Sequence, residues 1–188
     1  HIDKKNSIKI RTFVDTDSSF EYAENKILQK YSIDTKYKTT YIELKENALC
    51  KGIEAQSLSL IEKLSIKHKV KKDHILFNQG DMADSLFILL QGEVEIRLYT
   101  SKDEYKRLAK YNPGTFFGEI SFISPGKRSA SAIVNSNAVL LELTHNSIVN
   151  LKAQHKEELL LHLLFKLGNT MGKELRDSAQ EIRRLEQV

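Results

Sequence analysis

Apolar and polar residues alternate along the middle of the chain, between positions 68 and 143. A period of two predicts β-strands, because successive side chains of a strand point to opposite faces of a sheet. Turn signals at Gly80-Asp81 and Gln91-Gly92 flank the apolar run 86–90, and a charged hairpin tip is expected at 100–106. About eight short strands of this kind predict a mainly β fold with flanking helices, an eight-stranded jelly-roll barrel. The expected strand residues include Val70, Ile75, Phe77, Val94, Ile96, Leu98, Leu108 to Tyr111, Ser131 to Val134 and Val139 to Leu143.

Helical spacing replaces this alternation on both sides of the strand region. Residues 44–67 carry signals for short helices, and Thr144 or Asn146 is placed to cap a helix that runs to Gln154. A longer helix is expected from about Lys156 to Glu186. Its apolar residues follow an alternating four-three spacing, which is typical of a seam for a partner helix or for the barrel itself, and we favour a homodimer. The seam residues are Leu164, Gly168, Met171, Leu175, Ser178, Ile182 and Leu185, with a second stripe at Leu160, Leu163 and Leu167.

The first 31 residues do not fit the strand region that follows them. Positions 8–12 alternate as in a short strand, and residues 20–31 repeat at helical spacing. One strand and one helix bury too little surface for a core of their own. We therefore interpret residues 1–31 as the end of a preceding α/β domain or as a docking arm, 32–43 as a polar linker, and 44–188 as the main domain.

The composition is that of an ordinary globular protein. The 188 residues are 40% hydrophobic and 29% charged, with a net charge of +4 and a pI near 9.0. This charge is mild, so nucleic acid is not an expected partner. The single Cys50 forms no internal disulfide and fits a reducing cytoplasm. No apolar run approaches the roughly 20 residues that span a bilayer. Because the chain begins with His1, we expect it to belong to a longer protein, located in the cytoplasm or at the cytoplasmic face of the inner membrane.

Catalysis and metal binding are not expected from this chain. Jelly rolls of the cupin kind bind metal through histidine and glutamate side chains on their strands, and no H-x-H pair occurs here. We therefore predict no enzyme, no metal and no cofactor other than a bound ligand. The six histidines are His1, His68, His74, His145, His155 and His162.

The stretch FGEISFISPGKRSAS, residues 117–131, combines groups that suit a sugar phosphate. Arg128 offers a bidentate fork to phosphate oxygens. Gly118 permits close approach of the backbone, and the turn after it can present unpaired N–H groups. Ionised Glu119 only accepts hydrogen bonds, so its natural partner is a ribose hydroxyl. The simpler interpretation is that Glu119 and Arg128 form a structural ion pair in a barrel without ligand.

The same stretch resembles the phosphate-binding cassette of the cyclic nucleotide-binding domain family, which reads F-G-E-L-A-L, a short spacer and then R-x-A. The segment from Phe77 to Val94 is similar to the strands that precede the cassette in that family, and the resemblance covers about Leu44 to Leu185. It implies that Glu119 binds the ribose 2′-hydroxyl and that Arg128 binds the exocyclic oxygen of a cyclic phosphate. The ligand-binding residues that it implies are Gly118, Glu119, Ile120, Ser121, Arg128, Ser129 and Ala130.

The cassette departs from the family pattern at a few positions. Ser121 takes the place of the usual small residue, Phe122 stands where the family has Leu, and Lys127 stands where Pro is often found. Pro125 lies two places before that Lys. These differences concern the shape of the loop and leave the two ligating side chains in place.

The segment IKIRTFVDTDSSFEYAENKILQKY, residues 8–31, resembles the last strand and helix of a STAS domain. A STAS domain followed directly by a cyclic nucleotide-binding domain is an arrangement seen in bacterial SulP-type anion transporters and in some glutaminases. With the transporters, the resemblance implies a parent protein that is embedded in the membrane; with the glutaminases it does not. The alternative is an arbitrary helical lead-in.

These features predict a regulatory module that binds a cyclic nucleotide, cAMP or cGMP, and signals from a larger protein such as a SulP-type sulfate transporter. One alternative is a regulator similar to the catabolite-activator family but truncated before its DNA-binding domain. Because the chain ends at Val188, no helix-turn-helix is expected. The other alternative is a degenerate jelly roll that binds nothing and serves dimerisation. The sequence leaves open the base of the nucleotide and whether Phe165, Met171 or Leu175 covers it.

Overall fold

The computed structural model describes residues 19, 22–23, 26–27, 40–101 and 104–185. The chain divides into two compact units, residues 1–37 and 38–188. In the first unit, the described residues 19, 22–23 and 26–27 are helical, within the segment for which helical spacing predicts a helix. The strand expected at residues 8–12 lies outside the described residues, as do most of the STAS-like segment and most of the proposed linker.

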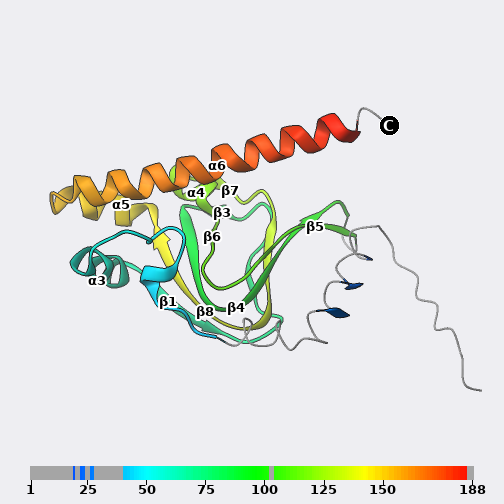
Figure 1. The fold of residues 1–188 in the computed structure, drawn as a ribbon, viewed down its shortest axis with the longest axis horizontal. Helices are drawn as coiled ribbons and strands as arrows, with labels where there is room; N and C mark the ends of the chain where they lie inside the picture. Colours follow the sequence, from blue (N-terminus) through cyan, green and yellow to red (C-terminus); the bar gives the residue numbers. More distant parts are fainter. Residues whose placement is uncertain (1–18, 20–21, 24–25, 28–39, 102–103, 186–188) are drawn as a thin grey trace, which may run out of the picture. The chain divides into compact units, whose positions relative to one another are not determined.

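The second unit is built of antiparallel strands with helices at both ends of the sequence (Figure 1). Its helical elements are η1 (Leu44–Glu46), α3 (Ala55–Leu64), α4 (Glu119–Ile123), α5 (His145–Ala153) and α6 (Glu157–Leu185). Its strands are β1 (Ile66–Val70), β2 (Ile75–Phe77), β3 (Met82–Ala83), β4 (Ser85–Tyr99), β5 (Tyr105–Tyr111), β6 (Phe116–Phe117), β7 (Gly126–Lys127) and β8 (Ser131–Thr144). The mainly β fold with flanking helices and a long C-terminal helix is confirmed.

Two long strands, β4 and β8, form the centre of the main sheet of this unit. They pair antiparallel from Ser85 opposite Thr144 to Arg97 opposite Ser131. The first half of β4 also pairs with β6 and its second half with β5, while the two halves of β8 pair with β2 and β1. A separate two-stranded ribbon joins β3 to β7, which places Met82–Ala83 directly beside the cassette.

The apolar run 86–90 is buried on both faces of β4, which explains why it does not alternate with polar residues. Leu86, Ile88 and Leu90 belong to a core cluster shared with the helices, including Ile61 of α3 and Leu163 of α6. The residues between them point to the other face and join a second cluster. That second cluster contains Phe87, Leu89, Val94, Phe117, Ala132, Val134, Ala138 and Leu140. Each face of one strand therefore faces a separate core.

The strand β5 begins at Tyr105, earlier than the expected start at Leu108, so the prediction of a charged tip through Lys106 was wrong. Aromatic contacts account for the longer strand. The Tyr105 ring lies 5.5 Å from the ring of Tyr99 on the paired strand, and the Arg97 guanidinium lies 4.4 Å above it. Such cross-strand contacts extend the pairing beyond what the charged sequence indicates.

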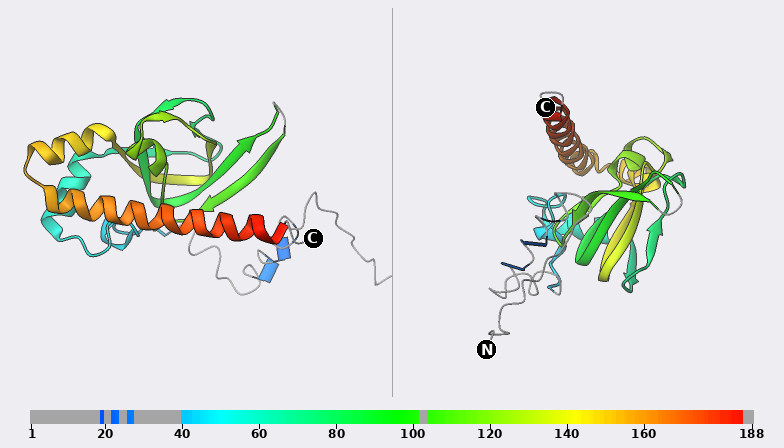
Figure 2. Two further views of the ribbon diagram at one scale, coloured as in Figure 1. Left: turned by 90° about the horizontal axis from the view of Figure 1, so that it is seen from above. Right: turned by 90° about the vertical axis from the view of Figure 1, so that its right-hand side faces the viewer.

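Helix α6 passes along one side of the strands and past α4 (Figures 1 and 2). Its buried residues are Leu159, Leu163 and Leu167, which pack into the core cluster with Leu151 of α5. Within the part of the chain that the structure describes, no helix has the length and apolar character needed to cross a membrane.

Candidate functional site

The first turn of α4 lies at the centre of the cassette. Gly118 caps this helix with a left-handed backbone, φ +82°, and Glu119 is its first residue. A Cβ at Gly118 would lie 2.8 Å from Arg128 Nη1 and 3.2 Å from the Ser85 carbonyl oxygen. Glycine is thus required both by the backbone angle and by the close packing of the arginine.

The Arg128 side chain is buried, with 5% of its surface exposed. Nη1 donates to the carbonyl oxygens of Ser85 at 2.8 Å and Gly118 at 3.3 Å, and Nη2 donates to Ser85 Oγ at 3.0 Å. The guanidinium also lies 4.1 Å above the Phe77 ring, a cation–π contact. These contacts fix the orientation of the guanidinium group.

Burial lowers the pKa of Arg128, and the carboxylates of Glu142, Asp84, Glu119 and Asp81 act in the opposite direction. Arginine nevertheless keeps its charge, because its ordinary pKa lies far above physiological pH. The buried positive charge is therefore balanced by carboxylates at some distance rather than by one in contact. Among the described residues, the hydrogen bonds of the Arg128 side chain all end on Ser85 or Gly118. The simple Glu119–Arg128 ion pair considered from sequence is not formed.

One donor of this guanidinium is left without a partner: Arg128 Nε is buried and makes no hydrogen bond. Buried N–H groups in folded proteins are nearly always hydrogen-bonded, and an orphan on a charged group is costly. An anionic oxygen in the adjacent cavity would satisfy it with a charge-assisted hydrogen bond.

Glu119 is also buried, with 7% of its surface exposed. It lies close enough to Tyr111 of β5 and Glu174 of α6 to act on both groups. Burial, followed by the charges of Glu174 and Glu119, raises the pKa of Tyr111 to about 12. Burial, followed by the charges of Glu119 and Asp177, raises the pKa of Glu174. Helix α6 thus brings a carboxyl group to the neighbourhood of the site.

A cavity of about 170 Å³ lies at this point, and all seven ligand-binding residues implied by the resemblance line it. The sequence interpretation missed Ile96, Leu108 and Tyr111, which complete the wall from β4 and β5. The alternation of apolar and polar residues on β4 and β5 was the available signal for these residues. It does not indicate which face of the strands contacts the cassette. The full lining is Phe77, Ile96, Leu108, Ala109, Tyr111, Phe117, Gly118, Glu119, Ile120, Ser121, Arg128, Ser129 and Ala130.

A larger groove of about 530 Å³ lies elsewhere on the described surface. It is lined by Ile75, Asn78, Gln79, Gly80, Tyr99, Ser101, Ser131 and Ile133. These residues include no charged side chain, so this groove lacks the fixed cation that an anionic ligand needs. The smaller cavity, with a guanidinium and a carboxylate on its wall, is the better candidate site.

Neither metal nor nucleophile chemistry is apparent in the described residues. They contain no group of three or more histidine, cysteine, aspartate or glutamate side chains able to hold a metal ion. Burial raises the pKa of the Cys50 thiol to about 12, so this thiol is not available as a thiolate at neutral pH.

Comparison with known proteins places this geometry in a family context. Residues 67–155 match the family model described as the cyclic nucleotide-binding domain. Glutaminase 2 of Bradyrhizobium diazoefficiens is 28% identical over 152 residues, which are 81% of this chain and 23% of that protein. The Cyclic AMP receptor protein of Thermus thermophilus is 28% identical over 100 residues, which are 53% of this chain and 46% of that protein. The chain thus spans less than half the length of either relative.

Solved structures share the same fold. The crystal structure of Thermus thermophilus Catabolite Activator Protein superimposes with a TM-score of 0.66 at 24% identity, covering 74% of this chain and 63% of that one. Residues 67–155 thus carry the match to the cyclic nucleotide-binding domain, and this solved structure shows that the fold is shared.

Proposed function

We propose that this chain is a regulatory module that binds a cyclic nucleotide, cAMP or cGMP, in the cavity beside α4. The observation that carries the proposal is the buried Arg128 guanidinium with an unpartnered Nε next to buried Glu119. A cyclic nucleotide presents an anionic phosphate and a ribose hydroxyl at a short, fixed separation, which matches a cation and a carboxylate on one cavity wall.

In this arrangement the ligand phosphate accepts from Arg128 Nε and from backbone N–H groups of the first turn of α4. The free amides at the start of a helix favour an anion. Glu119 accepts from the ribose 2′-hydroxyl, and the Ser129 hydroxyl, also on the cavity wall, is placed to donate to the phosphate. Phe77 and Tyr111 provide apolar surface for the remainder of the ligand.

The cavity also suggests how binding becomes a signal. Its volume of about 170 Å³ is below the usual range for ligand pockets, which begins near 300 Å³. In our proposal a nucleotide displaces part of the wall, including α4. Phe122 of α4 belongs to the same core cluster as Leu163 and Leu167 of α6, and its carbonyl accepts from His145 Nδ1 at 2.9 Å. A shift of α4 is thus transmitted to α5 and α6, and the ligand selects the shifted state.

Titration of the purified chain with cAMP and with cGMP tests the proposal. Either nucleotide should bind and raise the melting temperature, because a ligand that binds only the folded state stabilises it. 5′-AMP is the control, since it carries the same base and sugar without the cyclic diester. If neither cyclic nucleotide binds at millimolar concentration, the domain is a degenerate relative and the proposal fails.

The role of Glu119 can be tested separately from that of the phosphate. Glu119→Gln should weaken the binding of the preferred nucleotide about tenfold, because a hydrogen bond to a charged group contributes about 1.5–3 kcal/mol. The same substitution should change the affinity for the 2′-deoxy analogue by less than about twofold. Calorimetric titration of both proteins with both ligands gives the coupling energy. An equal loss for the two ligands would assign Glu119 to some contact other than the 2′-hydroxyl.

We further propose that α6 forms a homodimer through its outer face. Leu161, Phe165, Leu175 and Ile182 are exposed, Phe165 to 71% and Leu175 to 73%, and all four fall on positions of one four-three pattern that begins at Leu161. Gly168 lies in the same stripe, where a Cβ would meet nothing within 4 Å, so a second helix has room to approach closely. This stripe shares Gly168, Leu175 and Ile182 with the seam expected from sequence, but Leu161 and Phe165 are more exposed than Leu164 of that seam.

The dimer predicts a change in mass when charge is placed on that stripe. Leu175→Glu should convert a dimer to a monomer in analytical ultracentrifugation, because facing charges in an apolar seam oppose association. Arg176→Glu, on the neighbouring exposed position, is the control and should leave the mass unchanged. A wild-type chain that sediments as a monomer at 100 μM would contradict the proposal.

The larger protein to which this module belongs is also a proposal. The STAS-like segment favours a cytoplasmic sensor tail of a SulP-type anion transporter. A regulatory segment attached to a glutaminase is a second candidate, supported by the match to Glutaminase 2 over 81% of this chain. A truncated regulator similar to catabolite activator is compatible with the shared fold. The gene sequence upstream distinguishes them: membrane spans favour the transporter, and a glutaminase domain favours the second candidate.

A further inference from the structure

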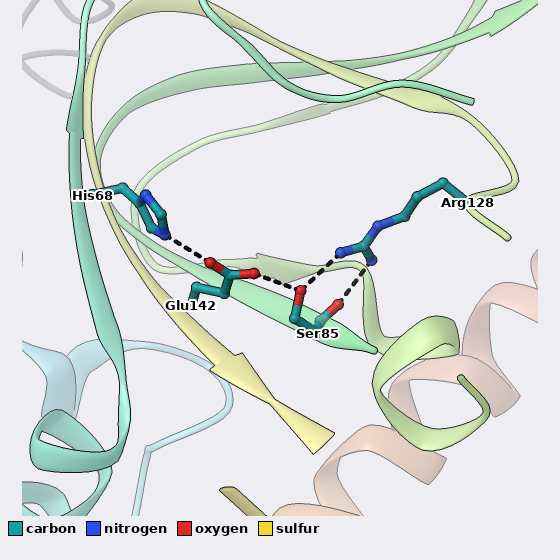
Figure 3. Close-up of polar contacts among 4 residues, drawn as sticks. All are labelled: His68, Ser85, Arg128 and Glu142. Carbon is teal, nitrogen blue, oxygen red and sulfur yellow. Dashed lines mark hydrogen bonds and ion pairs between the residues drawn. The ribbon is translucent and has the colours of Figure 1, made fainter. Parts of the chain in front are cut away.

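Behind Arg128, a chain of hydrogen bonds crosses from the cavity to the edge of the sheet (Figure 3). Arg128 Nη2 lies 3.0 Å from Ser85 Oγ, Ser85 Oγ lies 2.7 Å from Glu142 Oε1, and Glu142 Oε2 lies 2.7 Å from His68 Nε2. These residues come from the cassette, the start of β4, the end of β8 and the edge strand β1. None of Ser85, Glu142 and His68 was implicated by the sequence, and none lines the cavity.

The directions of these bonds follow from the chemistry of the groups. The guanidinium only donates, so Ser85 Oγ accepts from it and uses its own proton toward Glu142. An ionised carboxylate only accepts, so His68 donates from Nε2. Each group therefore fixes the orientation of the next one. In particular, Glu142 determines which way the Ser85 hydroxyl points, and so which lone pair faces Arg128.

Charge adds to this geometric argument. Of the four carboxylates that oppose the effect of burial on the pKa of Arg128, Glu142 acts most strongly. It does so without touching the guanidinium, because Ser85 stands between the two groups. Ser85 and Gly118 thus hold Nη1 and Nη2 of Arg128 by hydrogen bonds. Nε makes no hydrogen bond and is left to donate to a ligand.

We propose that Glu142, held by His68 and acting through Ser85, positions the Arg128 guanidinium for the ligand phosphate. The inference rests on the proposed function, because the positioned group is the phosphate ligand of that site. His68 takes part by donating to Glu142, which fixes the carboxylate that orients the Ser85 hydroxyl.

Other charged groups near this chain must be separated from His68. Lys67 and Lys69 lie beside it on β1, where alternation directs their side chains to the opposite face, and Phe87 of β4 contacts the imidazole at 6.0 Å between ring centroids. Around Arg128, the other carboxylates are Asp81, Asp84 and Glu119, and Glu174 of α6 lies near Glu119. The pKa of Glu174 is raised, and His145 donates to the α4 carbonyl of Phe122.

The first test compares variants of Glu142 and Ser85 in the full chain, with cAMP and cGMP as probes. Glu142→Met fills the same space but removes the acceptor, and it should weaken nucleotide binding about tenfold. Glu142→Gln keeps an acceptor for the Ser85 hydroxyl and should restore affinity to within about threefold of wild type. Ser85→Ala, which retains the backbone carbonyl contact, should cost about threefold to tenfold.

Side-chain ¹⁵N spectra of the free protein give a readout that needs no nucleotide. In wild type, hydrogen bonds of Nη1 and Nη2 to Ser85 restrict rotation about the Nε–Cζ bond of Arg128, which would exchange the two nitrogens. Separate Nη signals are therefore expected, assigned by their loss in Arg128→Lys. In Glu142→Met they should coalesce. If they stay separate, Glu142 does not position Arg128. If wild type binds neither nucleotide, the proposed function fails, and these spectra still decide whether Glu142 fixes the guanidinium.

The role of His68 is tested by the same nucleotide titrations. His68→Phe, which fills the space but removes the donor to Glu142, should weaken nucleotide binding about threefold. His74→Phe, which replaces an exposed histidine before β2, is the control and should leave the affinity unchanged. Wild-type affinity in His68→Phe would overturn the role of His68.

Discussion

Arg128→Ala is expected to weaken cyclic nucleotide binding about a hundredfold, the largest effect of any single substitution in the cavity. Truncation removes the charge and the unpartnered Nε donor together, and breaking a hydrogen-bonded charge pair in a buried site costs about 2–5 kcal/mol. Arg128→Lys should retain the charge but lose about tenfold, because an ammonium group cannot reproduce the planar fork held against Ser85. Calorimetric titration with cAMP and cGMP measures both losses.

Folding must be monitored in the same variants, since Arg128 is a buried charge. Removing it loses the contacts to Ser85 and the Phe77 ring but also removes the cost of burying the charge. We expect the free energy of unfolding to change by less than about 2 kcal/mol, with the native circular dichroism retained. Arg176→Ala, on the exposed surface of α6, is the matched control. Wild-type affinity in a folded Arg128→Ala protein would show that the phosphate binds elsewhere.

The cassette was predictable from sequence because its chemistry is local. Gly118, Glu119 and Arg128 lie within one short stretch, and one helical turn plus one returning loop brings them to the same cavity. Each residue type also indicated its role by its own chemistry. Gly118 permits close approach of the backbone, Glu119 is a hydrogen-bond acceptor, and Arg128 is a cation with a bidentate fork. Local spacing therefore indicated which residues lie together at one cavity, and their role as ligands of a nucleotide stays a prediction.

Ser85 and Glu142, the residues that hold Arg128 through hydrogen bonds, could not be predicted from local spacing. Ser85 lies 43 residues before Arg128, and Glu142 lies 57 residues after Ser85. Their contact depends on the pairing register of β4 with β8, in which Ser85 stands opposite Thr144. A period of two shows that strands exist but leaves their partners and register open. A one-residue slip would direct Glu142 to the other face.

The long helix shows a related limit. The four-three spacing correctly predicted an amphipathic helix, but a helix with apolar residues on several faces allows more than one seam. Leu163 and Leu167, the second stripe in the sequence interpretation, are the residues that bury against the domain. Leu175, assigned to the main seam, is exposed. Only the position of α5 and the sheet decides which stripe faces inward.

Gly92→Ala is expected to lower the free energy of unfolding by about 3–4 kcal/mol, the largest stability effect of a single methyl group in this domain. Gly92 sits where the register of β4 with β8 shifts, between Gln91 and Glu93. Its φ is +90°, and an added Cβ would lie 2.5 Å from the Asn137 carbonyl oxygen and 2.7 Å from the Ala138 Cα. Both obstacles are backbone atoms of the paired strand, so neither can rotate away, and the two long strands must separate.

Gly80→Ala provides the matched control, because it shares the unfavourable backbone angle without the collision. Gly80 has φ +89°, and a Cβ there would meet nothing within 4 Å. The free energy of unfolding of this variant should fall only by the cost of a left-handed backbone at a residue with a Cβ, about 1–2 kcal/mol. Urea unfolding of the two variants measures the difference, which we expect to be about 2 kcal/mol and to come from the contact with Asn137. Equal losses would mean that the bend between the halves of β4 and β8 can relax, and that these strands do not hold the two cores in one fixed geometry.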